Sequence, residues 1–195
     1  MDSTDPSFWE TRYLAGRTPW DFRGVPPGLV DFLQRANGTG TVLIPGCGTG
    51  YEVKAFHGAG WRPLAIDFSP TAVRQAREAL GSLASFVRQA DFFGEDVGGP
   101  FDLIYERTFL CSLPPERWPS YVARMVQLLR PGGLLAGLFY YGSDPEGPPF
   151  PMAASQARSL LSPFELRTDR PVPAEQSLTL FAGHERWQEW QLKSR

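Results

Sequence analysis

The sequence predicts an α/β fold in which a mostly parallel sheet carries helices on both faces. Short apolar runs alternate with segments of helical periodicity over residues 41–141. A glycine-rich turn, Pro45-Gly46-Cys47-Gly48-Thr49-Gly50, joins the first apolar run to the helical segment that follows it. Because strands that alternate with helices pair in parallel with right-handed crossovers, these two observations favour a layered α/β domain.

The first part of the chain is expected to be helical. The aromatic-rich residues 8–20 fit a short helix followed by a loop. Apolar side chains recur at helical spacing over residues 28–35, and Asn37-Gly38 is a plausible stop signal.

The central elements follow from apolar runs and helical periodicity in turn. Five apolar runs are predicted to be strands: residues 41–44, 63–67, 85–88, 101–106 and 134–141. Pro70 favours a helix start because proline is suited to a first turn. Three helices are predicted: residues 51–59, 71–80 and 115–130, the last closed by Pro131-Gly132-Gly133.

Beyond Pro151 the alternation changes, which suggests an antiparallel edge. A helix is expected near residues 153–161. Three further strands are expected: residues 164–168, 177–182 and 187–192.

Length and composition indicate one globular domain over residues 1–195, with 42% hydrophobic and 21% charged residues. No apolar run approaches the roughly 20 residues that span a bilayer, so we expect no membrane insertion. The polar, acidic residues 1–6 lack the pattern of a secretory signal, so we expect a cytoplasmic protein.

Charge and cysteine content argue against two classes of partner. The formal net charge is −2, and basic residues are scattered among acidic ones, so a nucleic-acid substrate is disfavoured. The two cysteines, Cys47 and Cys111, show no zinc-site spacing, and we expect no metal. Cys47 is expected to be a small residue in a crowded turn and not a nucleophile, and Cys111 is expected to be a core residue. Neither His57 nor His184 has an acid or nucleophile partner in sequence, so a catalytic triad is not supported.

The glycine turn is the first candidate binding site. In an open α/β sheet, ligands bind beyond the carboxyl ends of the strands. Gly46, Gly48 and Gly50 allow close backbone approach, and amides at the following helix start favour a negative group, either a pyrophosphate or an amino-acid carboxylate. The spacing Gly-x-Gly-x-Gly differs from the nicotinamide fingerprint. The alternative is a purely structural turn.

Two acidic positions follow later strands. Asp67 ends the second strand 21 residues after Gly46, where a ribose-binding acid is expected. Its alternative role is a helix N-cap, which Ser69 fills better. Asp91 and Phe92 follow the third strand, where a carboxylate and a ring can contact adenine, although an ordinary loop is an equal reading.

Several segments together resemble the thiopurine S-methyltransferase family, including its plant thiol/halide branch. They cover most of residues 8–150 in the family's order. The segments are Phe8-Trp9-Glu10 through Thr18-Pro19-Trp20-Asp21, Leu43-Ile44-Pro45-Gly46-Cys47-Gly48-Thr49-Gly50, Phe101-Asp102-Leu103-Ile104-Tyr105-Glu106-Arg107, Leu128-Leu129-Arg130-Pro131-Gly132-Gly133 and Gly147-Pro148-Pro149-Phe150. The resemblance implies a Rossmann-like class I methyltransferase fold that uses S-adenosylmethionine, with a mostly parallel seven-stranded sheet, helices on both faces and an antiparallel C-terminal edge.

The resemblance also implies a cover over the cofactor. In the plant branch, N-terminal aromatic residues close over it, which assigns this role to Trp9, Tyr13 and Trp20 within residues 1–37. A sulfonium beneath aromatic rings is a favourable cation-π arrangement. The alternative is that these rings pack an N-terminal helix onto the core. Tyr13 stands where the plant branch has tryptophan.

Two further residues are implied on the substrate side. Arg107 follows the fourth strand, and the resemblance places it where it attracts an anionic nucleophile and reaches the cofactor. The alternative for Arg107 is an ion pair with Glu106 or another carboxylate. Tyr140 matches an aromatic position near the methyl group, whereas Tyr141 is expected to face the other side because side chains alternate along a strand.

The sequence therefore predicts an S-adenosylmethionine-dependent methyltransferase acting on a small soft nucleophile, most simply the sulfur of a thiol. A thiolate or halide arrives already nucleophilic, so little acid-base machinery is needed. The alternatives are a halide ion, an O- or N-methylated small metabolite, a nicotinamide oxidoreductase and a non-catalytic S-adenosylmethionine-binding protein.

Overall fold

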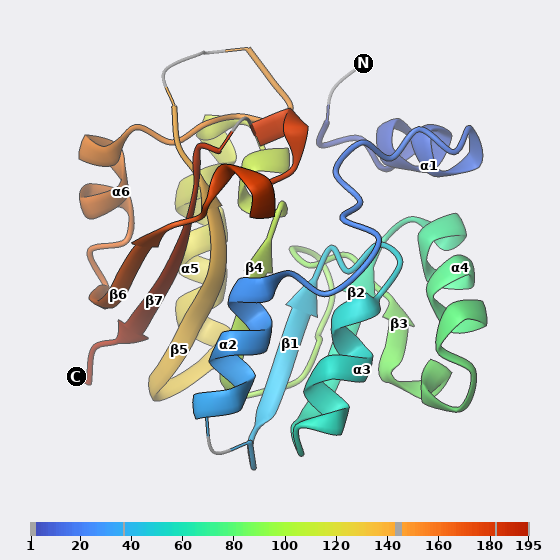
Figure 1. The fold of residues 1–195 in the computed structure, drawn as a ribbon, viewed down its shortest axis with the longest axis horizontal. Coiled ribbons are helices and arrows are strands. Elements are labelled where there is room, and N and C mark those ends of the chain that lie inside the picture. Colours follow the sequence, from blue (N-terminus) through green and yellow to red (C-terminus); the bar gives the residue numbers. More distant parts are fainter. Residues whose placement is uncertain (1–2, 37, 143–145, 182, 195) are drawn as a thin grey trace. The chain divides into compact units, whose positions relative to one another are not determined.

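The computed structural model describes residues 3–36, 38–142, 146–181 and 183–194 (Figure 1). The expected stop signal at Asn37 lies outside these residues. The chain forms two compact units, Met1–Val97 and Gly98–Arg195. Seven strands pair in the order β3-β2-β1-β4-β5-β7-β6. The prediction of a mostly parallel sheet with an antiparallel C-terminal edge is confirmed. A single domain over residues 1–195 stays a prediction.

Unit 1 carries three parallel strands and four α-helices among its described residues. Strand β2 pairs in parallel with both β1 and β3. The elements are α1 (Pro6–Leu14), α2 (Pro27–Arg35), β1 (Thr41–Pro45), α3 (Tyr51–Gly58), β2 (Arg62–Asp67), α4 (Pro70–Leu80), the 3-10 helix η1 (Gly81–Phe86) and β3 (Val87–Gln89). Strand β3 therefore begins at Val87 instead of the predicted residue 85, because η1 occupies the preceding residues.

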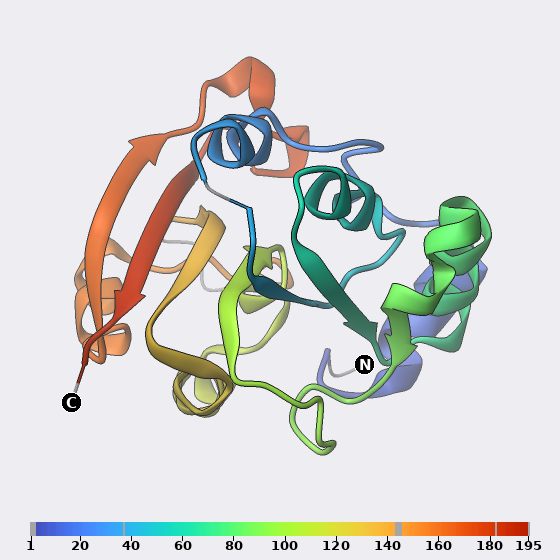
Figure 2. The same cartoon turned by 90° about the horizontal axis from the view of Figure 1, so that it is seen from below.

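The core of unit 1 follows from its apolar pattern. Val42, Leu43 and Ile44 are all buried, as expected for a parallel strand covered on both faces. Figure 2 shows α2 and α3 side by side along β1 and β2. Helix α4 starts at Pro70, and the Oγ of its N-cap Ser69 accepts a hydrogen bond from Ala72 N at 3.1 Å.

Unit 2 combines a parallel pair with an antiparallel edge. Strand β4 pairs in parallel with β5, and β7 lies antiparallel between β5 and β6. The elements are β4 (Phe101–Arg107), η2 (Leu110–Ser112), η3 (Pro115–Arg117), α5 (Trp118–Leu128), β5 (Leu129–Tyr140), α6 (Ala154–Leu160), β6 (Phe164–Pro171), η4 (Ala174–Gln176), η5 (Thr179–Phe181) and β7 (Glu185–Leu192).

The boundary between α5 and β5 corrects one prediction. The helix ends at Leu128, and β5 already contains the Pro131-Gly132-Gly133 segment that was expected to close the helix. The pairing register moves from Phe101↔Leu129 to Leu103↔Leu134, so β5 is irregular over this segment. Proline and a glycine with positive φ, 72° at Gly132, suit such a bulge.

The predicted strand at residues 177–182 is also wrong over its described part. Residues 179–181 form the 3-10 helix η5, with Phe181 N bonded to Leu178 O at 2.8 Å. The two strands that pair with β7 are β5 and β6. Ala182 lies outside the described residues.

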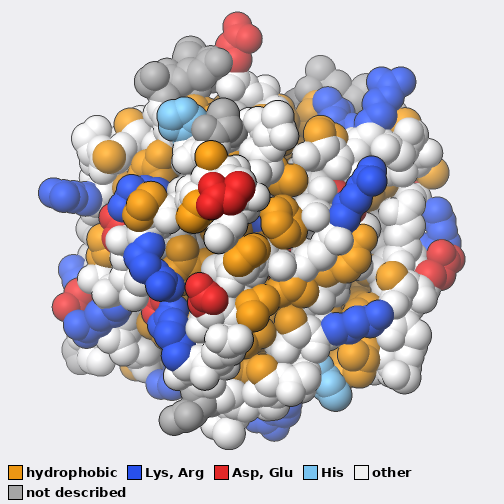
Figure 3. Space-filling view, in the orientation of Figure 1, with side chains coloured by type: hydrophobic (Ala, Val, Ile, Leu, Met, Phe, Trp, Pro, Cys, Tyr) orange, Lys and Arg blue, Asp and Glu red, His pale blue; other side chains and the backbone are white. Residues whose placement is uncertain are grey.

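The surface carries charges of both signs. Figure 3 shows Lys and Arg side chains spread over the visible face, with Asp and Glu side chains among them. No helix in the described part of the chain has both the length and the apolar composition needed to cross a bilayer.

Candidate functional site

The glycine turn between β1 and α3 needs glycine for its backbone geometry. Gly48 and Gly50 have φ values of 51° and 70°, which other residues rarely adopt. A Cβ on Gly50 would lie 3.3 Å from Ala76 Cβ and 3.3 Å from Leu80 Cδ1. The turn therefore brings its backbone close to α4 at Gly50, where a side chain would be tightly packed and its backbone strained.

Asp67, the last residue of β2, ties this turn to the next one. Its Oδ2 accepts from Gly48 N at 3.0 Å, and its Oδ1 accepts from Ser69 N at 2.9 Å. The side chain is 6% exposed. Burial raises the pKa of Asp67 to about 6, although the hydrogen bonds from Ser69 and Gly48 act in the opposite direction. The N-cap of α4 is Ser69, so the N-cap reading of Asp67 is wrong.

This arrangement fits a nucleoside with an attached amino acid. Each oxygen of Asp67 accepts one backbone N–H, and a carboxylate oxygen has capacity for a second donor such as a ribose hydroxyl. The turn ends at Gly50, where α3 begins with backbone N–H groups that suit a carboxylate. Gly46, Gly48 and Asp67 are therefore the residues that would hold such a group.

The predicted aromatic cover lies against the glycine turn. Tyr13 and Trp20 have ring centroids 5.9 Å apart, and Trp20 Nε1 donates to Tyr13 Oη at 3.4 Å. Trp9 meets Trp20 edge to face at 5.1 Å. A Cβ on Gly48 would lie 2.8 Å from Tyr13 Oη. The structure thus brings Trp9, Tyr13 and Trp20 together at the turn. Their role as a cofactor cover stays a prediction.

Glu10 was not predicted, yet it connects α1 to α4. Its Oε2 accepts from Ser69 Oγ at 2.5 Å and from Thr71 N at 3.1 Å, and its Oε1 accepts from Thr71 Oγ1 at 2.6 Å. Burial acts to raise the pKa of Glu10, but the hydrogen bonds from Ser69 and Thr71 lower it overall. The position of Glu10 one helical turn before Tyr13 is the available sequence signal.

Asp91 and Phe92 form a compact loop after β3. Asp91 is exposed, and its Oδ1 accepts from Phe93 N at 2.9 Å. Its own N–H donates to Glu95 Oε1 at 2.9 Å. Phe92 is buried and meets Phe93 edge to face. These contacts are those of an ordinary turn, and contact with adenine stays a prediction.

Glu106 fixes the loop after β4 in unit 2. Its Oε1 accepts from Phe109 N and Leu110 N, both at 2.9 Å, and its Oε2 accepts from Tyr121 Oη at 2.6 Å. The side chain is 1% exposed, and burial raises its pKa to about 7 against the lowering effect of these hydrogen bonds. The loop includes Thr108 with a φ of 58°. Glu106 thus acts as an anchor for backbone groups.

Arg107 follows Glu106 at the end of β4. The positive charge of Arg107 lowers the pKa of Glu185, but burial outweighs it and raises that pKa overall. Arg107 thus interacts electrostatically with Glu185, and its charge also acts to lower the pKa of the Cys111 thiol. Steering of an anion by Arg107 and its contact with the cofactor stay predictions.

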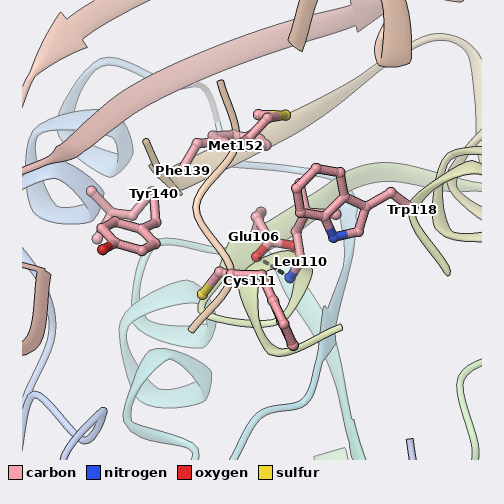
Figure 4. Close-up of a pocket in the computed structure, with 9 residues that line it drawn as sticks. Glu106, Leu110, Cys111, Trp118, Phe139, Tyr140 and Met152 are labelled. Carbon is pink, nitrogen blue, oxygen red and sulfur yellow. Dashed lines mark hydrogen bonds between the residues drawn. The ribbon is translucent and has the colours of Figure 1, made fainter. Parts of the chain in front are cut away.

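A small pocket in unit 2 lies beside Glu106 (Figure 4). Its lining is mostly apolar: Glu106, Leu110, Cys111, Trp118, Leu138, Phe139, Tyr140, Phe150 and Met152. In Figure 4, Glu106 lies between Tyr140 and Trp118, with a dashed line joining its carboxylate to the backbone of Leu110.

The two neighbouring tyrosines at the end of β5 point to different places. Tyr140 lines the pocket and packs on Phe181 with centroids 4.9 Å apart. Tyr141 Oη donates to Gln188 Oε1 at 2.9 Å. This is the alternation expected from the sequence. A role for Tyr140 near the methyl group stays a prediction.

The two cysteines are buried, which is as expected for Cys111 in the core. Burial raises the pKa of the Cys47 thiol and of the Cys111 thiol. A thiol with a raised pKa is a poor nucleophile at neutral pH. Cys111 also belongs to the pocket lining, where it adds a soft, polarizable surface.

Comparison with known proteins gives a consistent picture. A probable thiol methyltransferase 2 of Arabidopsis thaliana is 31% identical over 201 aligned positions, which cover 100% of this chain and 88% of that protein. A thiocyanate methyltransferase 1 of Brassica oleracea is 30% identical, with 97% of this chain and 86% of that protein covered.

A solved structure shows the same fold over nearly the whole chain. The 1,6-didemethyltoxoflavin-N1-methyltransferase of Burkholderia thailandensis, with bound 1,6-didemethyltoxoflavin and S-adenosylhomocysteine, has a TM-score of 0.77 and 20% identity. The similarity covers 97% of this chain and 87% of that one. The family model described as thiopurine S-methyltransferase matches residues 4–193. With its fold, its glycine turn and this match, the chain belongs to the thiopurine S-methyltransferase family and is an S-adenosylmethionine-dependent methyltransferase.

Proposed function

We propose that this methyltransferase transfers a methyl group to the sulfur of a small thiol. The observation that carries the proposal is the state of Glu106, the carboxylate of the apolar pocket in unit 2. Its Oε1 accepts from Phe109 N and Leu110 N, and its Oε2 accepts from Tyr121 Oη. These bonds tie the carboxylate to the protein, which makes it less available as a base for an amine or hydroxyl. A thiolate needs no such base.

Each predicted site residue then has a specific task. Bound S-adenosylmethionine supplies an activated methyl group on a sulfonium, with a good leaving group. The backbone of Gly46, Gly48 and Gly50 accommodates the methionine part, and Asp67 accepts hydrogen bonds from the ribose hydroxyls. Asp91 and Phe92 contact the adenine.

The aromatic residues Trp9, Tyr13 and Trp20 cover the cofactor and exclude water, which strengthens electrostatic contacts and prevents hydrolysis. Arg107 attracts the anionic acceptor, and Tyr140 shapes its approach. Since a thiolate is already nucleophilic, the protein contributes mainly alignment and desolvation.

A halide or thiocyanate ion is the second candidate acceptor. The Brassica relative is a thiocyanate methyltransferase, and thiocyanate is likewise an anion that needs no base. An O- or N-methylated metabolite is less well supported because it requires proton removal. We further expect the enzyme to work in the cytoplasm on small molecules and not on nucleic acid.

An assay of S-adenosylhomocysteine release tests the proposal. Purified protein is mixed with S-adenosylmethionine and, in separate reactions, an aromatic thiol, a thiopurine, iodide, thiocyanate or an amine. We expect the highest kcat/KM with a thiol. Turnover that is fastest with the amine would contradict the proposal, and turnover fastest with iodide or thiocyanate would favour the second candidate.

A further inference from the structure

Helix α1 is held on the cofactor-binding turns at two points of one face. Glu10 binds the start of α4, and Tyr13, three residues later, lies with its hydroxyl against Gly48. Residues three apart share a face of a helix. The same helix also carries Trp9, which meets Trp20 edge to face.

These two points are joined by a continuous chain of contacts through the cofactor turns. Glu10 Oε2 accepts from Ser69 Oγ at 2.5 Å, and Ser69 N donates to Asp67 Oδ1 at 2.9 Å. Asp67 Oδ2 accepts from Gly48 N at 3.0 Å, and Gly48 lies under Tyr13 Oη. The chain of contacts begins and ends on α1, so a shift of the helix acts on the positions of Asp67 and Gly48.

Glu10 binds several groups of the turn at the start of α4. Its two oxygens take three hydrogen bonds from Ser69 and Thr71, and Ser69 Oγ also caps α4 through Ala72 N. Arg74 adds a favourable charge, since its presence lowers the pKa of Glu10 further. Charge-assisted hydrogen bonds are about twice as strong as neutral ones. Glu10, which lies on α1, therefore stabilises the geometry of the turn at residues 67–71.

We infer that Glu10 is a positioning residue, which couples the docking of helix α1 to the geometry of Asp67 and Gly48 in the cofactor-binding turns. It acts through Ser69 and Asp67 and does not itself contact the cofactor. The inference rests on the proposed assignment of the ribose to Asp67. Binding of S-adenosylmethionine or its product then requires α1 to be seated, and a seated α1 places the aromatic residues over the turn.

Titration calorimetry with S-adenosylhomocysteine tests this inference on the full chain. In Glu10→Gln, one of the two acceptor oxygens becomes an NH2 group and the negative charge is lost, so the turn keeps fewer and weaker hydrogen bonds to α1. We expect binding about tenfold weaker than in the wild type. The matched control is Glu78→Gln, an exposed glutamate on α4, for which we expect wild-type affinity.

Two further readouts separate positioning from plain stabilisation. We expect KM for S-adenosylmethionine to rise in Glu10→Gln while KM for the acceptor stays unchanged. We also expect S-adenosylhomocysteine to protect the wild type from trypsin at Arg12 and Arg17, and to protect Glu10→Gln much less. A double-mutant cycle with Tyr13→Phe is expected to be non-additive in binding, because both residues hold the same helix.

The outcomes are distinct. A Glu10→Gln protein that is folded and binds S-adenosylhomocysteine as tightly as the wild type overturns the inference. If Glu10→Gln does not fold, Thr71→Val removes one of the donors to Glu10, and an unchanged affinity in that variant overturns the inference equally. A wild type without affinity for S-adenosylhomocysteine would instead contradict the cofactor assignment itself.

Discussion

Asp67 in unit 1 and Glu106 in unit 2 occupy similar places but are used differently. Each lies at the carboxyl end of a parallel strand, each is almost fully buried, and each accepts two backbone N–H bonds. Asp67 spreads these bonds over its two oxygens. Glu106 receives both on Oε1 and gives Oε2 to Tyr121.

This difference underlies the two roles that we propose for these acids. One bond on each oxygen leaves Asp67 with acceptor capacity that ribose hydroxyls can use. The three donors around Glu106 instead fix the loop that follows β4. Burial raises the pKa of both, to about 6 and about 7, so a raised pKa alone does not distinguish a binding acid from a structural one.

The largest effect is expected for Asp67→Asn. The amide cannot accept from both backbone N–H groups and both ribose hydroxyls, so S-adenosylhomocysteine affinity should fall about 100-fold. Calorimetry measures this directly. Asp31→Asn, at an exposed position of α2, is the control and should bind normally. A loss of less than about threefold in Asp67→Asn would mean that Asp67 is no more a binding acid than Glu106.

Glu106→Ala should show the opposite profile. The alanine side chain accepts from none of Phe109 N, Leu110 N and Tyr121 Oη, and a broken buried network costs about 2–3 kcal/mol of unfolding free energy. The corresponding fall in Tm is about 5–10 °C for a chain of this length. We expect S-adenosylhomocysteine affinity to stay near the wild-type value. Glu116→Ala, exposed in η3, is the control. An unchanged Tm would show that Glu106 does not hold the loop.

The pH dependence should separate binding from stability. Asp67 accepts ribose hydroxyls best when ionised, so affinity for S-adenosylhomocysteine should fall as the pH drops through about 6. Between pH 7 and pH 5 the expected loss is about tenfold. The Asp67→Asn variant should lack this dependence. A wild-type affinity that is constant from pH 7 to pH 5 would contradict the role of an ionised Asp67.

Folding stability should change with the opposite sign over the same range. Unfolded Asp and Glu have a pKa of about 4, whereas the folded pKa values are about 6 for Asp67 and about 7 for Glu106. The folded chain therefore binds these protons more tightly, and the stability they contribute is lost as the pH rises through 6 and 7. Urea unfolding should show a flatter pH dependence in Asp67→Asn and Glu106→Gln.

The smallest effect is expected for Arg107→Met, at the residue that follows Glu106. If Arg107 attracts an anionic acceptor, its loss should raise KM for an anionic thiol about fivefold, with little change in kcat. A neutral thiol of similar size should be unaffected. An unchanged KM for the anionic thiol would show that Arg107 does not attract the acceptor.

The parts of the fold and site that were predictable depend on local sequence. The strand, glycine turn and helix around Gly46–Gly50, and the acid at Asp67, follow from apolar runs and spacing over short distances. The end of α5 was not predictable in this way, because Leu129 and the segment after it belong to β5, which pairs with β4. Tertiary pairing overrode the local helical pattern there.

The contacts of Glu10 and Glu106 could not be predicted from the sequence for a related reason. Glu10 meets Thr71 across 61 residues of sequence, and Glu106 meets Tyr121 across 15. Neither contact can be predicted from sequence spacing, because the first depends on how α1 packs near α4 and the second on how α5 packs near β4. The sequence alternative for Glu106 is an ion pair with Arg107, and the structure shows that its Oε1 accepts hydrogen bonds that hold a backbone loop.

A crystal structure of the protein with S-adenosylhomocysteine tests the central claim most directly. We predict that both ribose hydroxyls lie within hydrogen-bonding distance of the Asp67 carboxylate, and that the amino-acid part follows the backbone of Gly46–Gly50. A nucleoside bound elsewhere, with Asp67 still bonded only to Gly48 and Ser69, would contradict it.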